Sequence, residues 1–261
     1  MFLLKTSESR VKQNAMTHVT PKTMLVTGGA KRIGRAIALH GARLGYDVAV
    51  HYRKARIEAE AVVSEIIAMG RRAVTVRGDL LEPESASAMI ESARASLGSV
   101  DVLVNNASTF HESTLMQFDL NELNHEIRVN AFLPLLLARH FASKTSQGAV
   151  VNLLDSRINS YDKTHAAYHL SKRMLYDITR MLALELSPGI RVNGVAPGLI
   201  LPPAGADEGY LETHKTENPL KRHGSPEEIA EAVLFLADAP FITGQVIYVD
   251  GGRHLNSSVY G

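Results

Sequence analysis

The sequence predicts an α/β fold: a doubly wound parallel sheet, covered by helices and built as a single domain. From Thr23 onward, short apolar runs rich in β-branched residues alternate with longer segments of helical period. This alternation is typical of parallel strands joined by crossover helices. The 261 residues contain no internal repeat and no low-complexity linker. Sheets of this class regularly form one core at this length, so one domain is expected.

Each expected strand is a short apolar run bounded by polar or glycine residues. The strands are expected at Met24–Thr27, Asp47–Tyr52, Ala73–Arg77, Val102–Asn105, Val150–Leu154, Arg191–Val195 and Val246–Val249.

The ends of several helices are also marked in the sequence. Gly45 and Gly70 each follow a helical stretch, as C-terminal capping glycines do. Ser225 and Pro226 open the last helix with a cap residue and a first-turn proline, and two glutamates follow at the positive end of the helix dipole. The stretch from Leu199 to His223 is rich in proline and glycine, and we expect a long irregular loop that acts as a lid.

Composition excludes several classes of function. The formal net charge is +1 and the basic residues are scattered, which argues against a nucleic-acid partner. The longest apolar stretch, Ala131 to Ala138, is too short to cross a bilayer, so no membrane partner is expected. There is no cysteine, which fits a reducing compartment, and a cytoplasmic location is expected. The 11 histidines are dispersed, and no metal is expected.

The first twenty residues are set apart from the rest. The stretch from Lys5 to Thr20 is polar and has no helical or strand period. We interpret residues 1–20 as a disordered arm or an overextended start, with Met16 as the alternative beginning. Residues 21–261 then form the domain.

A glycine-rich turn joins the first expected strand to the first expected helix. Its residues are Thr27, Gly28, Gly29, Ala30, Lys31, Arg32, Ile33 and Gly34. Glycines allow the backbone to approach a pyrophosphate, and the N-terminus of the helix offers free N–H groups and partial positive charge. Because the turn follows the first strand of an α/β chain, it predicts a Rossmann-type dinucleotide site.

Tyr168 and Lys172 are the first candidates for catalysis. Positions i and i+4 share one face of a helix, so the lysine ammonium can lie close to the phenol and favour its ionised form. Tyr168 is therefore a candidate proton donor. Thirteen positions before the tyrosine stands Asp155, where a serine would be the ordinary residue.

Together these residues resemble the short-chain dehydrogenase/reductase family, whose motifs can be followed from Thr27 to Gly252. The motifs are the glycine turn, Asn105 to Ala107 after the fourth strand, Asn130, Tyr168 with Lys172, Pro197 with Gly198, and Thr243 through Gly252. They occur in the order that the family shows.

The resemblance implies a role for each catalytic position. Asn130 would hold a water near Lys172, and Lys172 would bind the nicotinamide ribose and lower the pKa of the tyrosine. Tyr168 would pass a proton. The cofactor positions carried over in this way are Gly28, Arg32, Ile33, Gly34, His51, Tyr52, Arg53, Asp79, Leu80, Asn106, Ala107, Ser108, Tyr168, Lys172, Pro197, Gly198 and Leu199.

Two departures from the common family pattern resemble the pteridine reductase branch, which includes dihydromonapterin reductases. Arg32 stands where the glycine turn usually has a second glycine, and Asp155 stands at the position of the catalytic serine. In that branch the arginine touches both cofactor phosphate and pterin, and the aromatic residue that matches Phe110 stacks on the pterin ring. Further similarities are Ser108, the run His51 to Arg53, and the run Gly251 to Leu255.

The chemistry independently favours a ring with C=N bonds over a simple ketone. An ionised carboxylate beside a ketone oxygen would oppose the negative charge that develops there. An imine nitrogen instead needs a proton as hydride arrives at the neighbouring carbon, and Asp155 beside Tyr168 can take part in that transfer. Asp155 can also accept hydrogen bonds from an amino-substituted pyrimidine. The expected substrate-binding residues are Arg32, Phe110, Asp155 and Tyr168.

Simpler interpretations of the same residues remain open at this point. Phe110 is an ordinary core residue in one of them, and Arg32 binds only phosphate in another. In a third, Ser156 does the work of the missing serine, although it lies one residue out of register, which along a strand turns it to the opposite face.

The end of the second strand predicts the choice of cofactor. An NAD-selective site places an acid there, which would repel a 2′-phosphate. Here the strand ends in Tyr52, Arg53 and Lys54, and its one acid, Asp47, lies at the wrong end. We therefore expect NADPH, although Arg53 and Lys54 could also simply solvate a loop.

Arg32 is expected near the 2′-phosphate together with Arg53. Asp79 and Leu80 follow the third strand and are expected at the adenine.

Two other classes of function remain alternatives. One is a general carbonyl reductase of the same family, such as a 3-oxoacyl thioester reductase, against which Asp155 and Arg32 argue. The other is a nucleotide-sensing protein without turnover, against which Asn130, Tyr168 and Lys172 argue. The resemblance also implies a homotetramer in which the segment Arg253 to Gly261 lies near a neighbour's active site.

Overall fold

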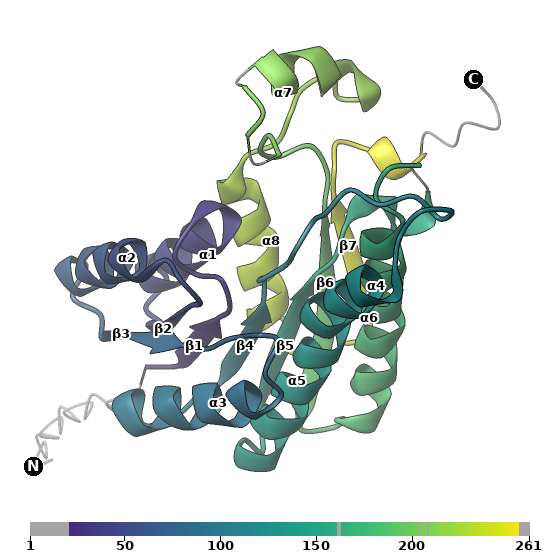
Figure 1. The fold of residues 1–261 in the computed structure, drawn as a ribbon. Coiled ribbons are helices and arrows are strands. Elements are labelled where there is room, and N and C mark those ends of the chain that lie inside the picture. The colour runs from purple at the N-terminus through teal and green to yellow at the C-terminus, as the bar shows by residue number, and fades with distance from the viewer. Residues whose placement is uncertain (1–20, 161–162, 204, 208, 256–261) are drawn as a thin grey trace, which may run out of the picture.

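A seven-stranded sheet runs through the middle of the molecule (Figure 1). The computed structural model describes residues 21–160, 163–203, 205–207 and 209–255, so the expected arm at residues 1–20 lies outside the described residues. The strands are β1 (Thr23–Val26), β2 (Asp47–Tyr52), β3 (Ala73–Arg77), β4 (Val102–Asn105), β5 (Gly148–Leu153), β6 (Ile190–Pro197) and β7 (Val246–Val249).

The sheet has the order β3-β2-β1-β4-β5-β6-β7, and every neighbouring pair is parallel. The expected doubly wound α/β fold is therefore confirmed. The bounds of the expected strands differ from the observed ones by one residue at most, except that β5 begins two residues earlier, at Gly148, and β6 continues two residues further, to Pro197. The start of β5 is extended because Gly148 and Ala149 pair with β6, and the end of β6 is extended because Ala196 and Pro197 pair with β7.

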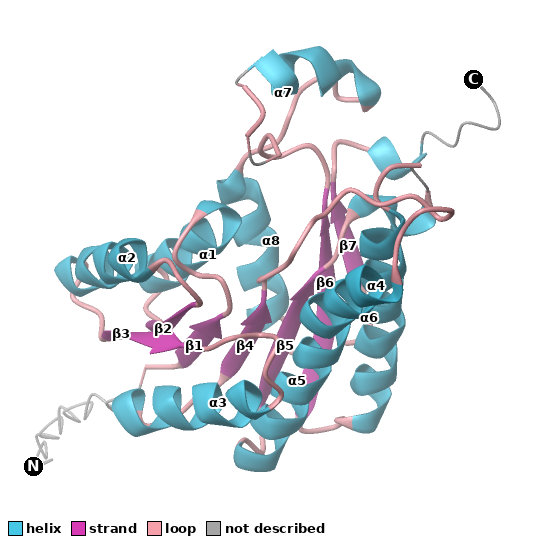
Figure 2. Cartoon of the chain, viewed as in Figure 1, coloured by secondary structure: helices cyan, strands magenta, loops and turns pink. Residues whose placement is uncertain are grey.

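Helices cover both faces of the sheet (Figure 2). One layer consists of α1 (Arg32–Arg43), α2 (Arg56–Ala68) and α8 (Pro226–Asp238). The other consists of α3 (Glu84–Leu97), α5 (Leu133–Lys144) and α6 (Ala166–Glu185), with α4 (Leu120–Ile127) against α6. Because both faces are covered, all four residues of β1 are buried. Val26 packs into the first layer and Leu25 into the second, as alternation along a strand requires.

The helix ends follow the local signals in the sequence. Gly45 and Gly70 have φ of +95° and +78°, the left-handed region that a glycine after a helix adopts at little cost. At the start of α8, the Ser225 hydroxyl accepts a hydrogen bond from the Glu228 N–H, and the Glu228 carboxylate accepts one from the Ser225 N–H. This reciprocal cap is the one that the sequence pattern indicates.

The stretch from Leu199 to His223 is more ordered than the sequence predicts. It contains a short helix, α7 (Gly209–His214), followed by a single turn at Lys215–Glu217. The Asp207 carboxylate starts the helix by accepting a hydrogen bond from the Tyr210 N–H. One capping aspartate among prolines and glycines is a weak signal, which explains why the sequence pattern indicates only a loop.

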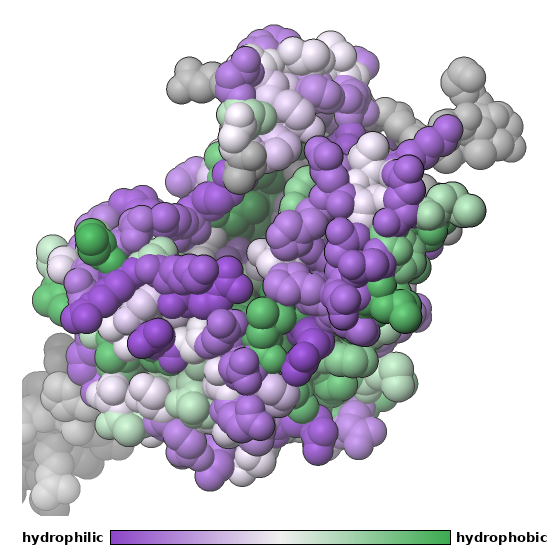
Figure 3. Space-filling model, viewed as in Figure 1, coloured by the Kyte–Doolittle hydropathy of each residue, from purple (hydrophilic) through white to green (hydrophobic). Residues whose placement is uncertain are grey.

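The chain leaves β1 and β4 in opposite directions, so these neighbours form the topological switch point of the sheet. Ligands of open α/β sheets bind at the carboxyl ends of the strands at such a point. Thr27, just after β1, accepts hydrogen bonds at its Oγ1 from the N–H groups of Asn106 and Ala107 after β4. The two expected motifs therefore meet at this edge, where Figure 3 shows the surface hollowed beneath the α7 segment.

Candidate active site

The Tyr168 hydroxyl donates a hydrogen bond of 2.8 Å to Oδ2 of Asp155. Tyr168 lies in the first turn of α6, and Asp155 follows the end of β5. The other carboxylate oxygen, Oδ1, accepts from the Arg157 N–H at 2.7 Å, which fixes the carboxylate plane. The structure therefore brings Asp155 and Tyr168 together as the motif spacing predicts. The neighbouring Ser156 is buried.

The pKa of Tyr168 is raised well above its ordinary value. Burial is the largest cause, followed by the charge of Asp155 and the hydrogen bond to it. The expectation that Lys172 would favour the ionised phenol is therefore wrong for this structure. Burial and an adjacent carboxylate both oppose a second negative charge. The phenol stays protonated and is ready to donate.

Lys172 is buried one helical turn further along α6. Its ammonium lies 5.7 Å from the centre of the Tyr168 ring and donates a hydrogen bond of 2.8 Å to the Leu153 carbonyl. Burial lowers the pKa of Lys172 to about 8, and the charges of Asp155 and Glu126 oppose that shift. The lysine thus titrates close to neutral pH.

Asn130 lies in a π-helical turn, Arg128–Phe132, between α4 and α5. Such turns are frequent at functional sites. Its Nδ2 donates to the Thr109 carbonyl, to Glu126 Oε2 and to Ser171 Oγ. Its Oδ1 accepts from the Thr109 N–H and the Ser108 hydroxyl. The side-chain amide is thus fully engaged within the protein, and a water near Lys172 would have to use another group of this segment.

Phe110 is half exposed rather than part of the core. Its ring stacks on His165 with centroids 4.0 Å apart and meets the edge of Tyr168 at 4.7 Å. An exposed aromatic ring beside the catalytic tyrosine offers a stacking surface to a flat substrate. The interpretation of Phe110 as an ordinary core residue is therefore wrong.

The glycine turn leaves room for a phosphate at the N-terminus of α1. A Cβ on Gly34 would come within 2.2 Å of the Gly28 carbonyl oxygen, so only glycine fits there. Lys31, which precedes the first turn of α1, makes no side-chain cap, and that turn holds no acid. These N–H groups thus remain available to an anion, and the turn fits the pyrophosphate of a dinucleotide. When bound, the reduced dinucleotide supplies hydride.

His51 is buried beneath the turn, with an exposed fraction of 1%. Its Nδ1 accepts a hydrogen bond from the Gly28 N–H, so its Nε2 carries the proton that is shared with the Gly78 carbonyl. Burial lowers the pKa of His51 to about 4, which keeps the ring neutral. Its side chain therefore supports the glycine turn from below rather than facing a cofactor.

Arg32 has φ of +53°, a left-handed conformation that is uncommon for a residue other than glycine. This is the position where the family pattern usually has glycine. The Arg32 guanidinium reaches across to donate a hydrogen bond of 2.7 Å to the Pro202 carbonyl, in the segment expected to act as a lid. Arg32 thus connects the phosphate turn to the lid.

Some of the basic side chains near the end of β2 form ion pairs and others do not. Lys31 forms an ion pair with Glu58, and Arg35 with Glu65. In the part of the chain that the structure describes, no carboxylate pairs with Arg53 or Lys54, so both remain available to a phosphate group.

The remaining expected cofactor residues lie along the same edge. Asp79 and Leu80 follow β3, and the Asp79 carboxylate accepts from the Leu81 N–H. Asn106 donates its amide to the carbonyls of Thr27 and Gly28, so it holds the turn in place.

Pro197 ends β6, and Gly198 and Leu199 lead from there into the lid. Leu199 and the base of the lid border a cavity of about 460 Å³ that reaches Tyr248 and Gly251.

Sequence reasoning missed Glu126 and His111. Glu126 is 1% exposed and lies on α4, where its carboxylate contacts both Asn130 and the His111 ring. A glutamate on a short polar helix usually faces solvent, so the sequence offers no clear signal for a buried one. Its only hint is its position, one helical turn before Asn130.

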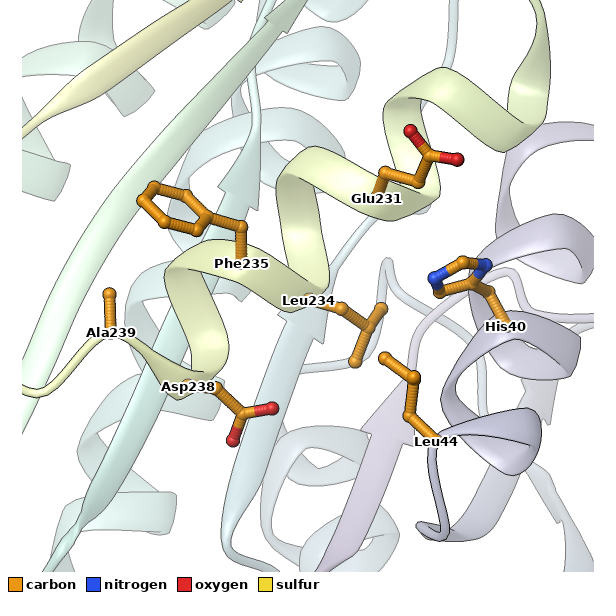
Figure 4. Close-up of a pocket in the computed structure, with 7 residues that line it drawn as sticks. All are labelled: His40, Leu44, Glu231, Leu234, Phe235, Asp238 and Ala239. Carbon is orange, nitrogen blue, oxygen red and sulfur yellow. The ribbon is translucent and has the colours of Figure 1, made fainter.

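A further cavity of about 460 Å³ lies between α1 and α8 (Figure 4). His40 and Leu44 line it from the last turns of α1, and Asp238 from the end of α8. Both helices run antiparallel to the strands, so this cavity lies at the opposite edge of the sheet. It shares no residue with the candidate active site.

Comparison with known proteins agrees with this geometry. The family model described as "Enoyl-(Acyl carrier protein) reductase" matches residues 28–254. L-rhamnose 1-dehydrogenase (NAD(P)(+)) of Sphingomonas sp. is 34% identical, over 90% of this chain and 97% of its own length. The 3-oxoacyl-[acyl-carrier-protein] reductase of Staphylococcus aureus is 37% identical, over 90% and 98%. The chain belongs to the short-chain dehydrogenase/reductase family and is an NAD(P)-dependent oxidoreductase.

Among solved structures, this chain is similar to FolM alternative dihydrofolate reductase 1 of two Brucella species, each in complex with NADP. The Brucella suis protein has a TM-score of 0.88 and the Brucella canis protein one of 0.86. Both are 34% identical, over 93% of this chain and 98% of theirs. No helix in the described ranges is long and apolar enough to span a membrane.

Lys172 predicts how activity depends on pH. In the role that the sequence predicts for it, Lys172 binds the cofactor as a charged ammonium, and this form is present below its pKa of about 8. We expect kcat/KM for reduction to fall as the pH rises through about 8, because the ammonium loses its proton. A pH profile measured with saturating cofactor tests this. A rate that stays constant well above that pH would contradict it.

Proposed function

We propose that this protein is an NADPH-dependent reductase of pterins, with a dihydropterin such as dihydromonapterin, or dihydrofolate, as substrate. The observation that carries this proposal is the hydrogen bond from Tyr168 to Asp155, a carboxylate in place of the usual hydroxyl. The likeness to two FolM alternative dihydrofolate reductases supports the same substrate class.

The carboxylate suits reduction of a C=N bond. Hydride adds to the ring carbon, the C=N π electrons move to nitrogen, and that nitrogen takes one proton. Tyr168 donates the proton and becomes a phenolate. Asp155 is partly exposed and bonded to the phenol, so it can take up one proton from solvent and pass it to the phenolate oxygen. A ketone would develop negative charge beside Asp155, which the carboxylate opposes.

Two further side chains fit a pterin. Phe110 offers an exposed ring face next to Tyr168, to which a flat heterocycle can stack. Arg32 spans from the phosphate turn to the lid and can donate to a ring carbonyl or nitrogen once it leaves the Pro202 carbonyl. The proposed pterin site thus lies between the ring of Phe110 and the carboxylate of Asp155.

A second candidate function is carbonyl reduction, such as that of a 3-oxoacyl thioester. The 37% identity to a 3-oxoacyl-[acyl-carrier-protein] reductase favours it. Asp155 argues against it, for the electrostatic reason given above.

Substitutions at Asp155 and Tyr168 separate the two functions. Tyr168→Phe removes the proton donor and should lower dihydropterin reduction by about 10²–10⁴-fold.

Asp155→Ala should abolish pterin reduction, because it removes both the pterin contact and the proton relay. In a carbonyl reductase, by contrast, Asp155→Ser should raise ketone turnover. NADPH oxidation with dihydropterins, dihydrofolate, quinones and acetoacetyl thioesters measures both. An Asp155→Ala variant with parental pterin turnover, in a parent that reduces ketones well, would refute the pterin assignment.

We also propose that the protein prefers NADPH to NADH, because Arg53 is exposed and has no carboxylate partner among the described residues, and Arg32 lies across the turn. Fluorescence titration should show much tighter binding of NADPH. Arg53→Ala should weaken NADPH binding by about tenfold, consistent with one lost charge-assisted bond, and leave NADH binding unchanged. Arg43→Ala, at the opposite end of α1, is the matched control. Equal dissociation constants for the two cofactors in the parent would contradict the preference.

A homotetramer is the proposed assembly. Leu170, Met181 and Leu184 are exposed, and their spacing places them on one side of α6, which suits packing against a second copy. The proposed contact of the C-terminal segment concerns mostly residues 256–261, which lie outside the described residues.

Sedimentation at micromolar concentration should give the mass of four chains. Leu184→Glu should lower that mass, because it places a charge in the packed face. Ile57→Glu, at an exposed position on α2, should leave the mass unchanged. A monomeric parent would contradict the assembly.

A further inference from the structure

Glu126 is a buried carboxylate that the proposed reaction does not use. Its side chain is 2% exposed, and a buried acid is costly unless its oxygens find partners. Each oxygen has one: Oε2 accepts from Asn130 Nδ2 at 2.7 Å, and Oε1 contacts Nδ1 of His111 at 2.6 Å. The His111 side chain is 63% exposed, so the pair reaches from the surface to the interior.

Asn130 transmits this contact to the loop after β4. Its amide pairs with the backbone of Thr109 in both directions, donating to the carbonyl at 3.1 Å and accepting from the N–H at 2.9 Å. The next residue is Phe110, whose ring stands against Tyr168. The far end of the loop is held separately, because Ser113 exchanges backbone hydrogen bonds with Thr164 and Ala166.

Glu126 also acts on the catalytic group through its charge. Helix α4, which carries it, packs against α6 (Figure 1). The negative charge of Glu126 raises the pKa of Lys172 and that of Tyr168. The titratable groups near Glu126 are His111, from the loop after β4, and Tyr168 and Lys172 of α6. The ring of His125 meets the ring of His111 edge to face. Asp155, after β5, acts on the same two α6 groups.

We infer that Glu126 is a positioning residue of the active site and acts through the amide of Asn130. The contact sets where the ring of Phe110 lies, and the charge helps to keep Lys172 protonated. This inference rests on the proposed function only in assuming that the Phe110 ring contacts the substrate.

Two conservative substitutions separate the contact from the charge. Glu126→Gln keeps an oxygen that can accept from Asn130 but has no charge. Its KM should stay within about twofold of the parent, and the alkaline limb of its kcat/KM profile should move to lower pH by about half a unit or more. Glu126→Asp keeps the charge, but its side chain is shorter by one methylene group, which moves the carboxylate away from Asn130. Its KM should rise by about tenfold, and its alkaline limb should stay in place.

Glu112→Gln is the control, since it removes an exposed acid of the same loop and should alter neither quantity. Thermal melting establishes that each variant is folded. If one variant does not fold, the KM and the alkaline limb of the other variant test the inference. An unmoved alkaline limb in Glu126→Gln, or a parental KM in Glu126→Asp, would overturn the inference. The assays use whichever of the dihydropterins, dihydrofolate, quinones and acetoacetyl thioesters the parent protein reduces. If that substrate is a ketone, the pterin assignment fails and the two signatures still test Glu126.

Discussion

The hydrogen bond between the Tyr168 hydroxyl and the Asp155 carboxylate is the interaction on which the active site depends. It joins the end of β5 to the first turn of α6, and its effect is electrostatic as well as geometric. Burial and the carboxylate together raise the pKa of the phenol and keep it protonated, and the carboxylate also opposes the loss of charge from Lys172. A neutral proton donor and a nearby cation can therefore coexist although both side chains are buried.

The sheet places the rest of the site around this pair. Because β1 and β4 are neighbours whose connections diverge, the glycine turn and the segment after β4 meet at one edge. Thr27 ties the two together, and His51 supports the turn from beneath. The first turn of α1 is left without a side-chain cap. The N–H groups of this turn, which side chains cap in many helices, are thus available to a dinucleotide phosphate.

The strands and the catalytic pair could be predicted from the sequence because they depend on local patterns. Buried parallel strands appear as apolar runs, and Asp155 is found by its spacing from Tyr168. Properties that depend on tertiary burial could not be predicted. The i and i+4 spacing of Tyr168 and Lys172 suggests that the lysine favours the phenolate, but burial and Asp155 reverse that effect. Likewise, Glu126 resembles a surface acid until α4 packs against α6.

The central claim is that a carboxylate beside the proton donor selects a C=N bond over a ketone. The most direct test is the ratio of kcat/KM for a dihydropterin to kcat/KM for an acetoacetyl thioester, measured on the unmodified protein with NADPH. The account predicts a ratio well above one, because the imine nitrogen takes the phenol proton as hydride arrives, whereas a ketone oxygen develops negative charge beside Asp155. A ratio well below one would contradict the account and would favour carbonyl reduction.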